Sequence, residues 1–593
     1  MAVAPEILSN QEINKIITAP GSPLETHYEV THLGIPMLTY KRMFPNVRTV
    51  WERTKAYADR TYLVFEDERY TYGQVREKVQ ALANSLYNEF GVRKGDRVAV
   101  IMRNYPEWII TFWATQLLGA VSVPINAWLT TPELEYCLSD SGTKVAIIDG
   151  ERAEKITPFI NSLSVAVIVT RTDKSWPGML GLADVLARNA GAKGYVDVEI
   201  GLDDNATILY TSGTTGKPKV GALGSHRNFL VNEMNRQAAA IRAALRSGMP
   251  VPVPNPNVQS CTLLSVPLFH ATGLVSILQE CTVNGGKLVL MYKWDIEKSL
   301  KLIQREKVNR AGGVPTMVHQ ILDHPDRDNY DLSSLQGLSY GGAPPGADLV
   351  ARIKRKWPAV GASNGYGLTE TSAGISANTG PDYVRKPDSC GPPSPVNFVR
   401  IVDVTTGKDL PSGEIGELWI RGPNVVKGYW NKPEATKEAF LEGPNLSWFR
   451  SGDLAEVDKD GWIYIRDRFK DMIIRGGENI YSAELEDAAY SFGPVIIDAA
   501  AFGIPHPVLG EEVAMVVTVS PSKASEVSKS NILNHMRKRL APFKIPVYLE
   551  VRTEMLERNA NGKIIKKDLK VEVSKRWEAE KLQQQGSGLQ AKL

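Results

Sequence analysis

One hydroxyl- and glycine-rich run limits what the surrounding chain can fold into. It follows an apolar stretch ending in Ile208-Leu209 and reads Tyr210-Thr211-Ser212-Gly213-Thr214-Thr215-Gly216-Lys217-Pro218-Lys219. Polyphosphates bind to hydroxyls, lysines and the backbone N–H groups that glycine allows to turn toward an anion. Ser, Thr, Gly and Pro also form ordinary surface turns. We expect a strand that leads into a phosphate-binding loop for ATP or a similar nucleotide.

This run is not the Walker A loop of P-loop NTPases. That motif requires a hydroxyl residue directly after its lysine, whereas Pro218 follows Lys217 here. The sequence therefore predicts a different nucleotide-binding fold.

Four further motifs follow in order along the chain: Tyr366-Gly367-Leu368-Thr369-Glu370-Thr371, Ser451-Gly452-Asp453, Arg468-Phe469-Lys470-Asp471 and Asn561-Gly562-Lys563. With the run at 210–219 they resemble the signature motifs of the adenylate-forming superfamily. Its members include acyl-CoA synthetases, 4-coumarate-CoA ligases, luciferases and the adenylation domains of peptide synthetases. The resemblance covers roughly residues 50–570.

The resemblance implies a nucleotide site. It assigns the β- and γ-phosphates of ATP to Thr211, Ser212, Gly213, Thr214, Thr215, Gly216 and Lys219. The adenine would lie against Gly341, Gly342, Ala343 and Pro344, with Tyr366 stacked on the ring and Gly367 and Thr369 beside it. Asp453 would accept hydrogen bonds from the ribose hydroxyls, with Arg468 beside it.

The same resemblance implies the chemistry. Catalytic roles fall on Lys563, Thr369, Glu370 and His270, with Glu370 as the ligand of Mg²⁺. Lys470 matches the hinge of a mobile small domain, and Gly476, Gly477 and Glu478 match the loop that meets the pantetheine arm of CoA. His270 matches a position near the acyl carboxylate, although a lone histidine beside apolar residues is more often structural.

Length and patterning predict an α/β protein of two domains. The 593 residues exceed one core, and strand and helix patterns alternate through the first half. With the resemblance, we expect an N-terminal extension (1–40), a large multi-sheet α/β AMP-binding domain (41–469), a mobile α+β C-terminal domain (470–573) and a flexible tail (574–593).

Composition excludes some classes of protein. A net charge of +3 argues against a nucleic-acid-coating protein, and Cys137, Cys261, Cys281 and Cys390 are too scattered for a metal site or a disulfide framework. The stretch from Trp108 to Ile125 is the most membrane-like, but its polar residues favour a buried helix running into a strand. The N-terminus lacks the pattern of a secretory signal.

The last three residues resemble a targeting signal. Ala591-Lys592-Leu593 is close to the Ser-Lys-Leu tripeptide that the peroxisomal import receptor reads. We expect a peroxisomal enzyme, and otherwise a cytoplasmic one.

The expected activity is that of an ATP-dependent acyl-CoA synthetase acting on a fatty or related carboxylic acid, with ATP, Mg²⁺ and CoA. Alternatives are a 4-coumarate-type aryl-CoA ligase and a non-catalytic nucleotide-binding scaffold. The chain departs from the family pattern after Lys219: the segment Val220-Gly221-Ala222-Leu223-Gly224 before Ser225 is one residue longer than usual.

Overall fold

The computed structural model describes residues 8–590 except 32–33, 212–219, 252–254, 256, 344, 347, 442–446, 477, 494 and 559–562; at residue 522 and from 581 onward it describes the backbone only. Within these ranges no helix has the length and apolar character needed to cross a bilayer. Residues 591–593 lie outside the described residues, so the peroxisomal address stays a prediction.

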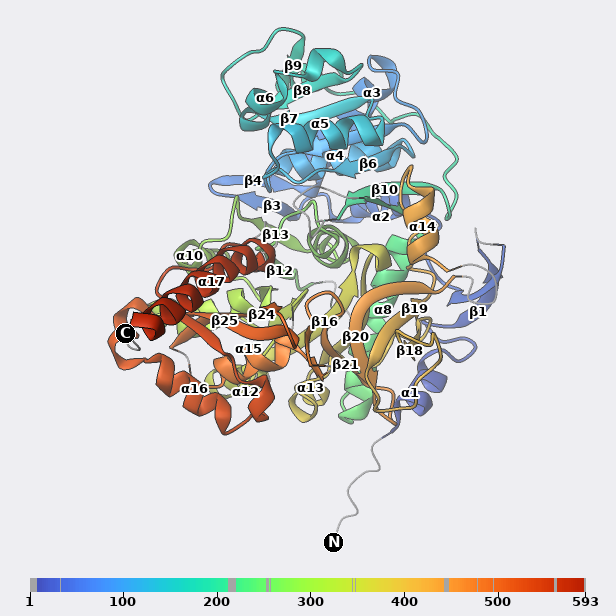
Figure 1. Ribbon diagram of the computed structural model, residues 1–593. Coiled ribbons are helices and arrows are strands. Elements are labelled where there is room, and N and C mark those ends of the chain that lie inside the picture. Colours follow the sequence, from blue (N-terminus) through green and yellow to red (C-terminus); the bar gives the residue numbers. More distant parts are fainter. Residues whose placement is uncertain are drawn as a thin grey trace.

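A seven-stranded sheet forms the upper block of the molecule in Figure 1. All neighbours in it are parallel except the β10–β11 hairpin. The strand order is β11 (Gly221–Ser225), β10 (Asn205–Tyr210), β6 (Val121–Pro124), β5 (Arg97–Ile101), β7 (Val145–Asp149), β8 (Ala166–Thr170) and β9 (Met179–Gly181). The helices of this region are α3 (Tyr72–Asn88), α4 (Pro106–Leu117), α5 (Thr131–Ser141), α6 (Gly150–Ile156) and α7 (Leu182–Arg188).

Local sequence explains two of these helices. Thr71 and Gln74 form a capping box at the start of α3, which buries Val75, Val79 and other apolar residues of one face. Helix α4 is buried along nearly its whole length and leads into β6. The prediction of a buried helix followed by a strand across residues 108–125 is therefore confirmed.

An eight-stranded sheet lies below the first. Its order is β17 (Ala373–Thr379), β16 (Gly361–Leu368), β15 (Gly337–Gly341), β14 (Arg310–Gly313), β12 (Cys261–Leu264), β13 (Lys287–Leu290), β3 (Thr61–Phe65) and β4 (Glu68–Thr71). Neighbouring strands are parallel except at the two ends, β16–β17 and β3–β4. One face packs on α10 (Ile296–Glu306), α11 (Pro315–Asp323) and α12 (Leu349–Lys356).

The opposite side of this sheet carries a different set of helices. The π-helix η3 (Thr272–Gln279) contacts β12 and β17, and α8 (His226–Arg246) contacts β17 and η3. The short helix α9 (Glu280–Val283) continues η3. All four cysteines are buried free thiols, as expected.

A third, antiparallel sheet completes the large domain. Its order is β18 (Phe398–Val402), β19 (Gly416–Arg421), β20 (Phe449–Val457) and β21 (Ile463–Arg468), with α13 (Pro381–Arg385) and α14 (Pro433–Ala439) nearby in the chain. The N-terminal elements α1 (Asn10–Ile17), β1 (Thr26–Val30), β2 (Pro36–Tyr40) and α2 (Val47–Arg53) come first; Ile13, Ile17 and Tyr40 form a small core with Val231 and Ala238 of α8.

The chain changes sheets between Arg468 and Ile473, where the small domain begins. Its sheet contains β23 (Glu478–Ile480), β22 (Ile473–Arg475), β25 (Gly510–Val519) and β24 (Ile496–His506), with β26 (Tyr548–Arg552) paired to β25. The helices are α15 (Ser482–Tyr490), α16 (Lys529–Arg537) and α17 (Lys566–Gln590). Figure 1 shows this orange and red unit beside the large domain.

Helix α17 corrects one expectation. Residues 574–590 continue this helix instead of forming a flexible tail. Val573 is fully buried, Trp577 packs edge-on against Tyr548 at 5.9 Å, and Arg576 pairs with Glu550 at 2.6 Å. The polar composition misled the prediction because this helix contributes only a narrow apolar stripe to the core.

Replacing Trp577 with alanine should destabilise the small domain by about 2 kcal/mol, because a half-buried aromatic side chain loses its packing. Calorimetry of the full chain should show a transition lowered by several degrees. Glu578→Ala, on the exposed face of the same helix, is the control. Equal melting curves for the two variants would mean that α17 adds nothing to stability beyond its first turns.

Candidate active site

A buried carboxylate joins two sheets of the large domain. Asp453 on β20 is 3% exposed and is the register partner of Arg468 on β21. The Arg468 Nε donates to Asp453 Oδ1 at 3.0 Å, and the hydroxyl of Tyr366 on β16 donates to Oδ2 at 2.6 Å. Burial and the Asp453 charge raise the pKa of Tyr366 well above its usual value. A carboxylate oriented from both sides retains lone pairs for the hydroxyls of a sugar.

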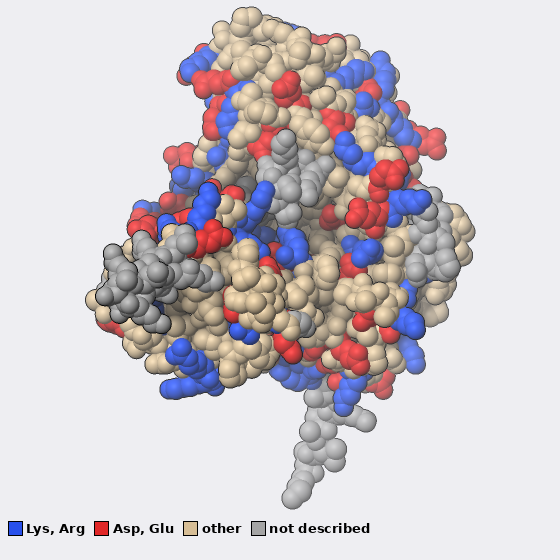
Figure 2. All heavy atoms as spheres, viewed as in Figure 1, with Lys and Arg blue, Asp and Glu red and all other residues tan. Residues whose placement is uncertain are grey.

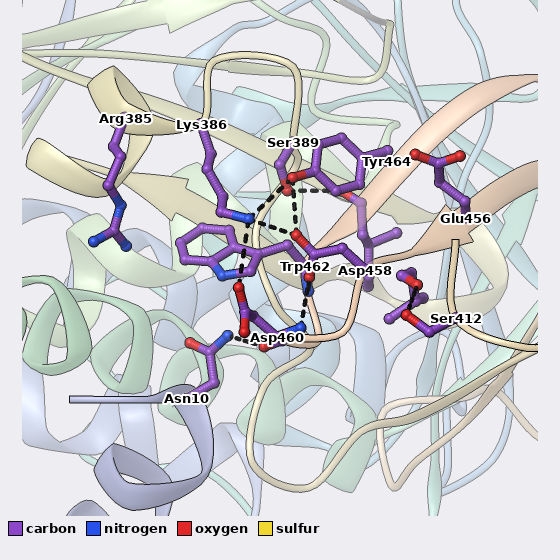
Figure 3. Close-up of polar contacts among 12 residues, drawn as sticks. Asn10, Arg385, Lys386, Ser389, Ser412, Glu456, Asp458, Asp460, Trp462 and Tyr464 are labelled. Atoms are coloured by element: carbon purple, nitrogen blue, oxygen red, sulfur yellow. Dashed lines mark hydrogen bonds and ion pairs between the residues drawn. The ribbon is translucent and has the colours of Figure 1, made fainter. Parts of the chain in front are cut away.

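The turn of the β20–β21 hairpin, at the opposite end from Asp453 and Arg468, is anchored to other parts of the large domain (Figure 3). Lys386 Nζ lies 2.5 Å from Asp458 Oδ2, and the hydroxyl of Tyr464 donates to the same oxygen at 3.1 Å. Asp458 Oδ1 accepts the Trp462 N–H at 2.9 Å, and Lys386 lies over the Trp462 ring. These contacts hold the hairpin from its turn, so Asp453 and Arg468 at its other end keep their places.

Glu370 lies in a strained turn directly after β16. The hydroxyl of Tyr429 donates to its Oε1 at 2.9 Å, and burial raises the pKa of the Glu370 carboxyl. Ser372 and Ala373 follow with positive φ angles of 50° and 89°, which non-glycine residues rarely adopt outside functional sites. A Cβ on Gly367 would lie 1.8 Å from the Ala373 oxygen, so only glycine fits there.

The described residues hold no group of three or more metal-ligating side chains. The family resemblance assigns a cation to one carboxylate, that of Glu370. That arrangement fits Mg²⁺, which proteins commonly hold by one or two carboxylates together with substrate phosphates and water.

Lys563 reaches the site from the small domain. Its Cε lies 4.0 Å from where a Cβ on Gly342 would stand, at the end of β15. Burial lowers the pKa of Lys563 to about 8, and the positive charges of Arg468 and Lys470 contribute, partly opposed by Asp453. The ammonium thus lies in a buried place where two cations act on it and Asp453 and Asp471 compensate only in part, so an anionic ligand would stabilise its charge.

His270 lies two residues before η3. Burial lowers the pKa of His270 to about 3, with the Lys563 charge adding to the effect, so the imidazole is neutral. Its Nε2 is buried and makes no hydrogen bond with any described residue. A neutral ring with an unused nitrogen is suited to contact a polar group of a ligand.

The predicted phosphate loop connects β10 to β11. Tyr210 pairs with Gly221, and the Thr211 N–H donates to the Val220 oxygen at 3.1 Å, so the two arms of the hairpin are closed. Residues 212–219 lie outside the described residues, and so do Pro344 and Gly477. The roles given to Ser212, Gly213, Thr214, Thr215, Gly216 and Lys219 stay predictions.

The structure brings together residues that are far apart in sequence: Tyr366 and Arg468 both contact Asp453, the charges of Asp453 and Arg468 act on Lys563, and Lys563 lies beside Gly342. Figure 2 shows Lys and Arg side chains gathered in the hollow at the centre of this face. Lys470 is exposed in the link between the domains. Gly476 and Glu478 lie in the β22–β23 hairpin, where the Gly476 N–H donates to Leu509 of the same domain and Glu478 is exposed.

Sequence reasoning missed two parts of the arrangement. Tyr429, which orients Glu370, follows Gly428 in a segment without any catalytic pattern. The second part joins the domains: Asp467 of β21 accepts the backbone N–H of Ser482 and, at 3.0 Å, its hydroxyl. Lys566 donates to Ser482 Oγ at 2.9 Å and pairs with Glu486 at 2.6 Å. Single polar residues at such junctions give no periodic signal.

Comparison with known proteins gives the following matches. The profile of the family described as AMP-binding enzyme matches residues 50–430, and that of the AMP-binding enzyme C-terminal domain matches residues 484–563. A feruloyl-CoA synthase of Amycolatopsis is 37% identical over 84% of this chain and 93% of its own length. A long-chain-fatty-acid–CoA ligase of Mycobacterium tuberculosis is 34% identical over 89% and 97% of the two chains.

Solved structures agree with this result. An anthranilate CoA ligase in complex with anthranoyl-AMP superposes with a TM-score of 0.79 at 25% identity, covering 89% of this chain and 97% of the other. The ATP-bound MatB of Rhodopseudomonas palustris superposes with a TM-score of 0.75 at 28% identity, covering 89% and 99%. The likeness spans both domains.

Asp453→Asn should weaken ATP binding about tenfold or more, because hydrogen bonds to a charged carboxylate are replaced by weaker ones to a neutral amide. Isothermal titration with ATP measures the change. The control is Asp460→Asn, in the exposed turn of the same hairpin. Unchanged affinity in the Asp453 variant would remove this carboxylate from the nucleotide site.

Proposed function

The chain belongs to the family of AMP-binding enzymes and is an AMP-forming acid–CoA ligase, and we propose that it activates a fatty or related carboxylic acid with the residues described above. In the first half-reaction a carboxylate oxygen attacks the α-phosphorus of ATP, forming an acyl-adenylate and releasing pyrophosphate. In the second, the CoA thiol displaces AMP. The observation that carries the proposal is the meeting of Lys563 from the small domain with Asp453 and Arg468 of the large domain.

Adenylation depends on holding two anions together. Asp453 and Arg468 fix the ribose, and Gly341 to Ala343 border the adenine, so the α-phosphate faces the acid from a defined direction. Lys563 then places its positive charge between the carboxylate and the α-phosphate, where the repulsion between the reactants is greatest. Positioning and charge neutralisation of this kind are the main contributions to phosphoryl and nucleotidyl transfer.

Mg²⁺ would be held by Glu370 and the phosphates and would neutralise charge on the leaving pyrophosphate. Tyr429 keeps Glu370 in place by its hydrogen bond. His270 would contact the carboxylate of the acid through its unused nitrogen. The imidazole would do so as a neutral ring, because its pKa is low.

Thioester formation requires a different face of the small domain. In our proposal, rotation at Lys470 withdraws Lys563 and brings Gly476 and Glu478 toward the acyl-adenylate. The rotation breaks the contacts of Asp467 with Ser482, because these residues lie on opposite sides of the link.

There are two alternatives to this proposal: an aryl acid in place of a fatty acid as the substrate, and a nucleotide-binding scaffold without turnover. An aryl acid is favoured by the 37% identity with a feruloyl-CoA synthase, whereas a fatty acid is favoured by the 34% identity with a long-chain ligase. A scaffold without turnover is disfavoured because Glu370, Asp453 and Lys563, which the proposed reaction uses, are all present.

Release of AMP and pyrophosphate should be measured with ATP, Mg²⁺ and a panel of short, medium, long-chain and aryl acids, with and without CoA. We expect CoA-dependent AMP formation with one class. Lys563→Ala should keep ATP binding and lose acyl-adenylate formation, whereas Lys567→Ala, an exposed neighbour, should remain active. Silence of the native protein across the whole panel would support the scaffold.

The pH dependence of adenylation should report Lys563. Because the ammonium must be protonated to act and its pKa is about 8, kcat/KM for ATP should fall as the pH rises through this value. Lys563→Arg, whose guanidinium stays protonated, should be slower but should lose the fall. Lys567→Arg should keep it. A fall near pH 8 that persists in Lys563→Arg would assign the titration to another group.

A further inference from the structure

The middle of the eight-stranded sheet carries almost no side chains on one face. Leu338, Tyr340 and Ala362 face α10, α11 and α12, whereas the alternate positions of β15 and β16 are Gly337, Ser339, Gly341, Gly361, Ser363 and Gly365. Ser339 is exposed although its strand is central. A Cβ on Gly337 would meet only the Gly361 oxygen, at 4.0 Å, and one on Gly365 would approach nothing closer than 3.6 Å. These observations describe a hollow.

Helices η3 and α8 form the roof of this hollow. Helix η3 contacts β12 on one side and β17 on the other, and so spans β14, β15 and β16 between them. Its Thr272 and Ser276 are exposed, and α8 lies against both η3 and β17. The hollow is therefore a channel with a floor of small residues and a helical roof.

The channel begins at the catalytic residues. Gly341 and Gly365, which are register partners, lie at the end of the floor beside Gly342 and Lys563. Four residues separate Gly341 from Gly337 at the other end, which corresponds to about 13 Å along a strand. Gly337 pairs with Gly361 on one side and with Arg310 of β14 on the other.

Charged residues close the far end of the channel. Arg310 is on the channel side of β14, because the next residue, Ala311, packs on the other face. Its NH1 contacts Glu280 Oε1 at the start of α9, and Arg236 NH1 of α8 lies 3.3 Å from the same oxygen. The side chains of Arg310 and Arg236 are 49% and 36% exposed, against 12% for Glu280. Arg236 also pairs with Glu233 of α8, its NH2 donating to Glu233 Oε1 at 2.6 Å. Floor and roof thus meet in an Arg236–Glu280–Arg310 cluster, with Glu233 behind Arg236, that still faces accessible space.

We propose that this cluster is a specificity determinant, which selects elongated acids bearing a hydrogen-bonding oxygen at the end remote from the carboxyl group. The inference rests on the proposed function, since it takes the channel as the acyl site. A distal hydroxyl, phenol or carboxylate accepts N–H bonds from the two guanidinium groups, which carry more N–H donors than Glu233 and Glu280 engage. An apolar terminus of the same length would displace water from these charges without replacing its hydrogen bonds.

The test uses two sets of matched acids. The first is a saturated fatty acid about 13 Å long with its ω-hydroxy and α,ω-dicarboxylic counterparts, and the second is the shorter pair of cinnamate and its para-hydroxy derivative. The measured quantity is the ratio of kcat/KM values within a pair for one enzyme preparation, which does not depend on the fraction of folded protein. The native enzyme should favour at least one class of oxygenated acid by about tenfold or more.

Arg310→Met and Arg236→Met should bring this ratio close to one while retaining turnover of the unsubstituted acid. Arg305→Met is the matched control, because Arg305 is similarly exposed and ion-paired but lies on α10, across the sheet. Gly337→Leu should fill the far part of the channel, lowering activity with all the long acids and sparing short ones.

The possible outcomes are distinct. A native enzyme that turns over the plain acids and shows no preference, or a preference unchanged in both arginine variants, would overturn the specificity assignment and leave the ligase activity standing. Full activity of Gly337→Leu with the long acids would place the acyl group elsewhere and would also overturn it. Absence of AMP formation with every acid would refute both the proposed function and the inference.

Discussion

The pairing of Asp453 with Arg468 is the interaction on which the rest of the site depends. It joins neighbouring strands of one hairpin, so the residue expected to hold the ribose and the residue next to the hinge are fixed by the same backbone register. Tyr366 brings the second sheet to the same carboxylate. The turn around Lys386 and Asp458 holds the hairpin at its other end. The proposed nucleotide site is thereby connected directly to the link between the two domains.

The sequence was most informative where chemistry requires particular residues in short segments. Gly367 is needed because any side chain would strike Ala373, and Thr71 and Gln74 begin α3 through a local capping box. Such constraints operate over a few residues and can be read directly. The family resemblance then indicated two domains and the convergence of Asp453 and Lys563, which local patterns alone could not have indicated.

What the sequence did not reveal depends on contacts between distant segments. Tyr429 and Glu370 are 59 residues apart, and Asp467 meets Ser482 across a domain junction. Glycine and serine in β15 and β16 read as weak strand formers, yet in the folded chain their small size leaves a channel open. The C-terminal helix was missed for a related reason: its polar sequence hides the few positions, such as Val573 and Trp577, that pack on the small domain.

The burial of the Lys563 ammonium has a consequence for the order of events in the proposed turnover. Burial and the charges of Arg468 and Lys470 oppose a charged Lys563 in this position, and Asp453 and Asp471 offset only part of that cost, because the pKa stays below its usual value. Polyanionic ATP would offset more of it, so in the proposed reaction ATP binding and the placement of Lys563 are thermodynamically linked. When pyrophosphate leaves, most of the compensating negative charge would leave with it, which would favour the rotation proposed for the second half-reaction.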